Sequence, residues 1–80
     1  MKYELLHDHS VHLVPFHMTL YRIRALRDIP RHNVKAGDLG GYVEGEHNLD
    51  QNDDSWIRDG VCVFGPARIE SAGETDKGEP

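Results

Sequence analysis

Residues 54–72 read DSWIRDGVCVFGPARIESA and carry a six-residue rhythm. One series of small or apolar residues recurs at this interval, and a second series follows two positions later. The two series are Ser55, Val61 and Ala67, and Ile57, Val63 and Ile69. A six-residue period with two inward positions per unit is typical of a parallel β-helix, whose short flat sides point alternate residues inward. The stretch therefore predicts a hexapeptide-repeat β-helix.

The same rhythm can be followed backwards, because three six-residue sides complete one coil and stack residue i on residue i+18. The predicted stacked pairs are Leu39 with Ile57, Val43 with Val61, and Leu49 with Ala67. Gly45 and Gln51 occupy the places of Val63 and Ile69, so the first coil is degenerate. We expect about two coils in residues 37–72, with Ile57, Val61, Val63, Ala67 and Ile69 inward. Gly40-Gly41 is expected at a sharp corner, because glycine accepts positive φ.

Two arms precede the coils, residues 3–14 and 18–29, and a short connection separates them. In the second arm Tyr21, Ile23 and Ala25 alternate with arginines, which favours a strand. A helix is the alternative, since the three-and-four spacing of apolar residues is also satisfied; β-favouring residue types and the short length favour the strand. The prediction is an all-β domain in residues 1–72, with a β-hairpin region in 1–30 packed on the coils. Residues 73–80 are expected to form a flexible acidic tail.

Alternation within the predicted sides turns Trp56, Cys62 and Arg68 outward. A large outward aromatic residue requires cover. Either the hairpin lies over this face, with Tyr21 and Ile23 near Trp56, or Trp56 anchors a partner.

Length and composition limit the function. A chain of 80 residues forms one small domain with a thin core, so a deep active site is not expected. The single cysteine, Cys62, excludes an internal disulfide and a multi-cysteine zinc site. No apolar run is long enough for a membrane span or a signal peptide, which predicts a cytoplasmic protein with no membrane contact.

Charge divides the chain into two halves. The net charge is −5, but residues 1–36 hold six basic and three acidic residues, whereas residues 37–80 hold three basic and eleven acidic residues. An acidic half repels nucleic acid and attracts basic protein surfaces, although such charge can also serve solubility alone.

Candidate chemistry is weak throughout. His7, His9 and His12 form the densest histidine cluster, but a third ligand of suitable spacing is missing, and no metal or other cofactor is expected. The serines lack a nucleophile-elbow motif, Cys62 has no activating neighbour, and paired acids on exposed strands are usually solvated. The arginines of residues 22–31 form a basic stripe, yet the acidic remainder argues against direct nucleic-acid binding. We therefore expect a protein that is not an enzyme.

A motif of more specific character spans residues 34–49, VKAGDLGGYVEGEHNL. With TLYRIRALRDI before it and the hexads after it, it resembles prophage-encoded hexapeptide-repeat proteins. These open with a β-hairpin, pass through a KxGDLGGFVE-type corner and continue as a left-handed β-helix. The resemblance covers residues 18–70 and implies the left hand of the coils, with Tyr42 where phenylalanine is common. The residues that match the corner are Lys35, Gly37, Asp38, Leu39, Gly40, Gly41, Val43, Glu44, Asn48 and Leu49.

A small acidic protein of this phage-like kind is similar in general character to anti-CRISPR proteins. The expected function is therefore non-catalytic inhibition of a host bacterial defence complex, a protein or ribonucleoprotein whose basic nucleic-acid-binding site the acidic surface would occupy. The expected partner-binding residues are Glu44, Glu46, Asp50, Asp53, Asp54, Asp59 and Trp56. The alternatives are a structural or assembly repeat protein without an inhibitory role, and a remnant of a hexapeptide acyltransferase. A homodimer is expected through the open apolar end near residues 61–69.

Overall fold

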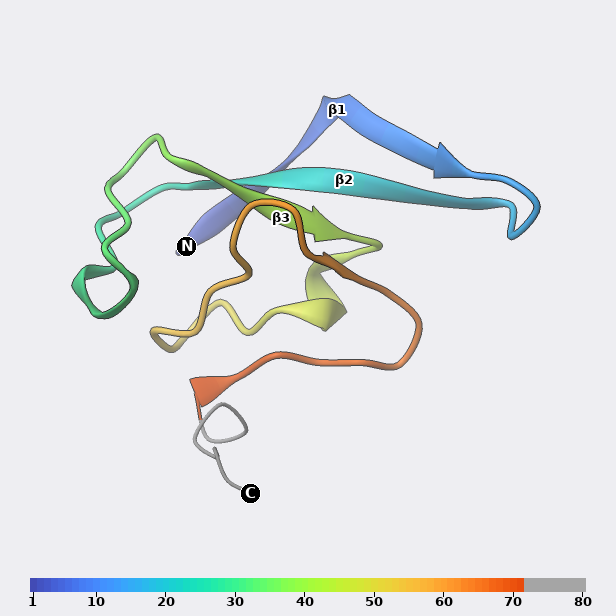
Figure 1. Cartoon of the computed structure of the whole chain (residues 1–80). Helices are drawn as coiled ribbons and strands as arrows, with labels where there is room; N and C mark the ends of the chain where they lie inside the picture. The colour runs from blue at the N-terminus through green and yellow to red at the C-terminus, as the bar shows by residue number, and fades with distance from the viewer. Residues whose placement is uncertain (72–80) are drawn as a thin grey trace.

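A computed structural model describes residues 1–71, and the predicted acidic tail lies outside them. The chain forms one four-stranded sheet in the order β1-β2-β3-β4 (Figure 1). The elements are β1 Tyr3–Leu13, β2 Met18–Ala25, the 3-10 turn η1 Pro30–His32, β3 Leu39–Val43, the 3-10 turn η2 Glu46–Asn48 and β4 Cys62–Val63. The first three strands are antiparallel, whereas β3 and β4 are parallel. The all-β class is confirmed, and no helix among the described residues is long and apolar enough to cross a membrane.

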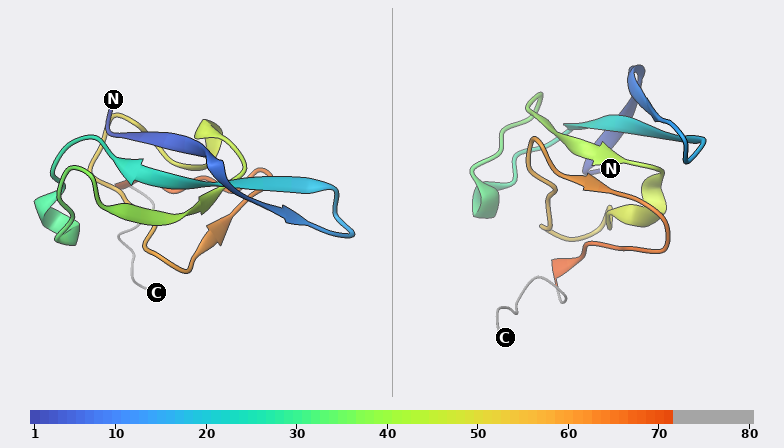
Figure 2. Two further views of the ribbon diagram at one scale, coloured as in Figure 1. Left: turned by 90° about the horizontal axis from the view of Figure 1, so that it is seen from above. Right: turned by 45° about the vertical axis from the view of Figure 1, so that its right-hand side comes forward.

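The second arm forms strand β2 and pairs with β1 in a hairpin, so the prediction of a strand is confirmed and the alternative helix is wrong. Tyr3 pairs with Ala25 and Leu13 with Met18, and the register shifts between Leu6 and Ser10. Alternation buries Ile23 and leaves Arg24 exposed, as the pattern predicts. The tip of the hairpin extends past the other elements (Figures 1 and 2).

Residues 39–71 are here called the body and include β3 and β4. After β3 the chain loops back beneath the sheet before it reaches β4 (Figure 2). Parallel pairing joins Tyr42 to Cys62 and Val43 to Val63 in the sheet, and an isolated bridge joins Leu49 to Ile69. Paired residues are thus twenty apart, and the predicted offset of eighteen is wrong. Hydrogen bonds within residues 50–55 explain the longer path, because the Asp50 carboxylate accepts from the Asn52 amide and the Asp53 carboxylate from the Ser55 amide. These bonds stabilise a corner longer than an ideal six-residue side allows.

The twenty-residue offset determines which residues of the two apolar series are buried. Ile57 and Val63 are buried and Ile69 is half-buried, so the second series points inward as predicted. Val61 is 37% exposed and Ala67 is exposed, and their predicted inward positions are wrong. The reason is the pairing itself, which places Val63 beside Val43 and Ile69 beside Leu49 and leaves Val61 and Ala67 outside these contacts; Ser55, the first member of the same series, is buried.

Gly40 and Gly41 do not form a corner; they lie within β3 and are buried. A β-carbon at Gly41 would lie 2.3 Å from the carbonyl oxygen of Val61 and 2.7 Å from that of Arg58. The glycines are needed because the chain at residues 56–61 passes directly against β3. The turn before β3 instead uses Gly37, whose φ is 96°.

Trp56 is only 8% exposed, because the hairpin covers it. A β-carbon at Gly40 would lie 2.7 Å from Trp56 Cζ2 and 2.8 Å from Ile23 Cγ1, so these two side chains flank the same point of β3. Tyr21 has a different contact from the predicted one, since its ring meets His7 edge-on at 4.8 Å. Residues from both parts of the chain form a single core: Tyr3, Ile23, Ala25, Ile29, Val34, Val43, Leu49, Trp56, Ile57 and Val63.

Candidate functional site

The structure places most of the expected partner-binding acids in ion pairs. Four of the six carboxylates meet a lysine or arginine side chain: Asp50 with Arg68 (2.9 Å), Asp53 with Lys2 (3.0 Å), Asp54 with Arg27 (3.2 Å) and Asp59 with Arg22 (2.8 Å). The Glu44 carboxylate accepts from the backbone amide of Gly65 at 2.9 Å, and the Glu46 carboxylate accepts from the side-chain amide of Gln51 at 3.4 Å. Much of the acidic charge that the sequence displays is therefore balanced within the fold.

Hydrogen bonds also group these carboxylates. Gln51 contacts Glu46 and both the Tyr3 amide and carbonyl, beside the Lys2–Asp53 pair. Arg27 bonds the carbonyl of Asp53 and the carboxylate of Asp54. The acids of residues 44–54 thus lie on connected segments, here called the acidic face: Glu44, Glu46, Asp50, Asp53 and Asp54. Asp59 lies apart, because its partner Arg22 projects from β2 and donates to the carbonyl of Gly40.

Asp53 has a structural role. The Lys2 side chain is fully buried, and its ammonium group donates to Asp53, to the carbonyl oxygen of Ser55 at 2.6 Å and to the Ser55 hydroxyl at 3.2 Å. Asp53 also accepts from the Ser55 hydroxyl at 2.6 Å and from the Ser71 amide at 2.7 Å. Burial, the largest influence, favours the protonated acid, but the hydrogen bonds from Ser55, Ser71 and Lys2 together hold the pKa of Asp53 well below its usual range. Asp53 therefore fastens the N-terminus to the body.

Two further buried residues, Asn48 and Tyr3, hold the backbone of the body through hydrogen bonds, and the sequence did not predict these roles. The Asn48 amide oxygen accepts from the Glu44 and Gly45 amides, and its nitrogen donates to the carbonyls of Gly65 and Ala67. The Tyr3 hydroxyl donates to the carbonyl of Leu49 at 2.7 Å, and burial raises the pKa of this phenol. Asn48 belongs to the corner motif, which could have marked it; Tyr3 carries no such signal.

The outermost carboxylates of the acidic face are Glu46 and Asp54. Glu46 is exposed, and the Asp54 side chain is 57% exposed despite its pair with Arg27. Asp59 is more exposed still, at 73%, but lies outside this face. The body holds seven acidic and two basic residues. Part of its acidic excess therefore reaches solvent at Glu46 and Asp54.

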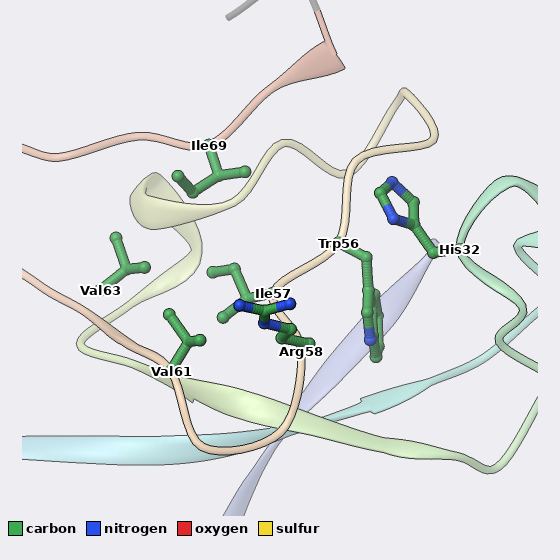
Figure 3. Close-up of a pocket in the computed structure, with 7 residues that line it drawn as sticks. All are labelled: His32, Trp56, Ile57, Arg58, Val61, Val63 and Ile69. Atoms are coloured by element: carbon green, nitrogen blue, oxygen red, sulfur yellow. The ribbon is translucent and has the colours of Figure 1, made fainter. Parts of the chain in front are cut away.

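A half-open cavity of about 450 Å³ lies beside β4 (Figure 3). Its apolar lining comes from Trp56, Ile57, Val61, Val63 and Ile69, and its polar lining from His32 and Arg58. Figure 3 shows His32 beside Trp56 at one end of the cavity and Val63 toward the other. Trp56, predicted as a partner anchor, contributes its ring to this wall and not to the outer surface.

The histidines of the hairpin lie apart from both features. His7 contacts Tyr21, and His12 lies 3.2 Å from the Thr19 hydroxyl. Within residues 1–71, no three histidine, cysteine, aspartate or glutamate side chains are grouped so that they could hold a metal ion. Cys62 is a free, exposed thiol on β4.

The arrangement offers two chemistries for recognition. Exposed carboxylates on a fixed backbone can bind lysine, arginine or backbone donors, and the cavity can accept apolar groups. Comparisons with models of protein families, with curated proteins and with solved structures gave no match.

Proposed function

We propose that this chain is a non-catalytic binding protein whose acidic face occupies a basic, nucleic-acid-binding surface of a host bacterial defence complex. The observation that carries the proposal is the fixed set of carboxylates in residues 44–54, of which Glu46 and Asp54 reach solvent. Such groups can take the place of phosphates against lysine and arginine, adding association rate and specificity.

Pre-organisation supports this role. Asp50, Asp53 and Glu44 accept hydrogen bonds from the chain, so the backbone that carries Glu46 and Asp54 is held in place before any partner arrives. Binding then loses less conformational entropy than it would with a mobile acidic segment. The exposed pair of Asp54 with Arg27 can be exchanged for a partner's cation at small cost, since such surface pairs contribute about 0–1 kcal/mol.

The proposal includes the architecture of residues 37–72 as about two coils of a left-handed hexapeptide-repeat β-helix of the prophage kind, with the first coil lengthened to twenty residues. Three parallel pairs at one constant offset support a coil: Tyr42 with Cys62, Val43 with Val63, and Leu49 with Ile69. Nuclear Overhauser contacts between the side chains of Leu49 and Ile69 test the stacking, because this pair lies outside the sheet. Contacts of Val43 with Val63 alone would leave only a sheet with a looped extension.

The functional test measures displacement of labelled target DNA from purified RNA-guided surveillance complexes. The parent chain should displace the DNA at 100 mM salt and do so more weakly at 400 mM, because charge pairs at an interface rim are screened. The double variant Glu46→Lys/Asp54→Lys should lose at least tenfold in inhibition. Its thermal unfolding should remain close to that of the parent, since both side chains are exposed.

A charge-matched control separates the acidic face from net charge. Asp8→Lys/Asp38→Lys adds the same four charges at exposed acids that lie outside the face, one on β1 and one in the turn before β3. This variant should inhibit within about threefold of the parent. Equal inhibition by all three proteins would show that the acidic face is a solubility coat, and a structural repeat protein would then be the better assignment.

A further inference from the structure

The two edges of the sheet differ in how well they are protected against pairing with another strand. The outer strand β1 presents His7, Asp8 and His9, and its register shifts between Leu6 and Ser10. Charged groups and irregular register are the devices by which proteins block edge-to-edge association. At the opposite edge, β4 and its neighbours read Val61, Cys62, Val63 and Phe64, with no charge among them.

The backbone of β4 has groups available for a further strand. The Tyr42 amide donates to the carbonyl of Val61 at 2.9 Å, and the Glu44 amide to that of Val63 at 3.3 Å. Because hydrogen-bonding groups alternate along a strand, the N–H and C=O of Cys62 point away from β3. Within residues 1–71 they face an unpaired edge, since β4 is the last strand in the sheet order.

The side chains of the same edge are apolar on both faces. Val61 and Val63 line the cavity of about 450 Å³, and Val61 is still 37% exposed. On the other face Phe64 is 45% exposed, next to the exposed Cys62. A strand added at this edge would extend the sheet and lay its own alternate side chains across the mouth of the cavity.

We propose that this edge binds a second copy of the chain, with the two β4 strands antiparallel about a two-fold axis through Cys62. Each Cys62 then exchanges both backbone hydrogen bonds with Cys62 of the other copy. An axis normal to the sheet keeps Val61 and Val63 of both copies on one face, so the two cavities, each also lined by His32 and Arg58, join at their apolar walls. An uncharged strand is compatible with its own copy, since no like charges meet.

The area that a stable dimer needs is a small part of the accessible surface of the chain. A lasting dimer buries about 800 Å² per partner, roughly one sixth of an accessible surface of 4832 Å². The cavity lining, the β4 edge and Phe64 are the apolar centre that such an interface requires. Dimer formation does not depend on the acidic face, so either proposal can fail alone.

The test compares two valines of almost equal exposure on opposite edges of the sheet. Val61 is 37% exposed beside β4, and Val11 is 38% exposed on β1. Sedimentation equilibrium of the 80-residue chain from 5 to 500 µM should show a dimer for the parent and for Val11→Lys. Val61→Lys should raise the dimer Kd at least tenfold, with an unchanged circular dichroism spectrum.

Three outcomes would overturn the proposal: a parent that is monomeric at 500 µM, a Val61→Lys protein that dimerises like the parent, or equal weakening by Val11→Lys. Cysteine crosslinking provides a second measurement. Hydrogen-bonded antiparallel partners have Cα atoms about 5.5 Å apart, within the range that a disulfide can bridge. Diamide, which takes up the two protons and two electrons of the thiols, should crosslink the parent at least tenfold faster than Val61→Lys. Equal rates would exclude the axis through Cys62.

Discussion

The hairpin and the body are each stabilised by a different kind of bond. β1 and β2 pair along most of their lengths through the backbone, and their far end reaches beyond the core. The body has only short parallel pairings, and side chains stabilise its loops: Lys2, Asn48, Gln51 and Asp53 all bond backbone groups. A ladder of backbone bonds tolerates most sequence changes on its exposed face, whereas a fold that depends on particular side chains does not. The body should therefore be far more sensitive to single substitutions.

The largest effect is expected from Gly41→Ala. Its β-carbon would lie 2.3 Å from a backbone oxygen, so β3 or the 56–61 segment must move. We expect a loss of about 3 kcal/mol or more, which is a large fraction of the stability of a small domain. Urea unfolding followed by circular dichroism measures it.

Gly37→Ala is the matched control, because nothing lies within 4 Å of its β-carbon and only its φ of 96° is strained. It should cost about 1–2 kcal/mol. Equal losses at the two glycines would show that close approach at β3 is unimportant.

Asp53→Asn tests the junction of the hairpin with the body. It removes the carboxylate that faces the buried Lys2 ammonium, and we expect a loss of about 3 kcal/mol at pH 7. The folded pKa of Asp53 lies below that of the unfolded chain, so the carboxylate stabilises the fold fully above pH about 4 and progressively less as the pH falls further.

The difference between Asp53→Asn and the parent should therefore shrink from pH 7 to pH 2.5, as measured by urea unfolding at each pH. A constant difference contradicts the role of the charge. Adding Lys2→Met should recover part of the loss, because no buried ammonium remains unpaired.

Asn48→Ala should have an intermediate effect. It leaves the amides of Glu44 and Gly45 and the carbonyl of Ala67 without their side-chain partner, at a cost of about 2 kcal/mol. Hydrogen exchange should accelerate at the two amides. Asn48→Asp keeps the acceptor and loses the donor, so it should protect these amides better than alanine does; the reverse order would be inconsistent with the assigned bonds.

The smallest effect is expected in the hairpin, from Arg24→Ala. Arg24 pairs with Glu4 across β1 and β2, but both side chains are substantially exposed. Such surface pairs contribute about 0–1 kcal/mol, and thermal unfolding should shift little at low salt and not at all at high salt. A loss as large as that of Asn48→Ala would mean that the hairpin also depends on particular side chains.

The sequence was sufficient to predict those parts of the fold that depend on a local pattern of residues. Alternation around Ile23 predicted β2, and the six-residue period predicted the inward positions of Ile57, Val63 and Ile69 but wrongly placed Val61 and Ala67 inward with them. It was insufficient for the candidate site, since the acids are visible in the sequence but the lysine and arginine partners of Asp50, Asp53, Asp54 and Asp59 are distant from them in it. Asp53 and Lys2 are 51 residues apart, and no local pattern joins them.

The sequence alone therefore determined the all-β class and the hairpin, because these follow from side-chain alternation and backbone preference over a few residues. The tertiary structure decided the twenty-residue offset, the close packing at Gly40 and Gly41, and the neutralisation of acids by Lys2, Arg22, Arg27 and Arg68. The physical reason is that packing distances and ion pairs depend on which distant segments meet. That choice is made by the free energy of the whole fold.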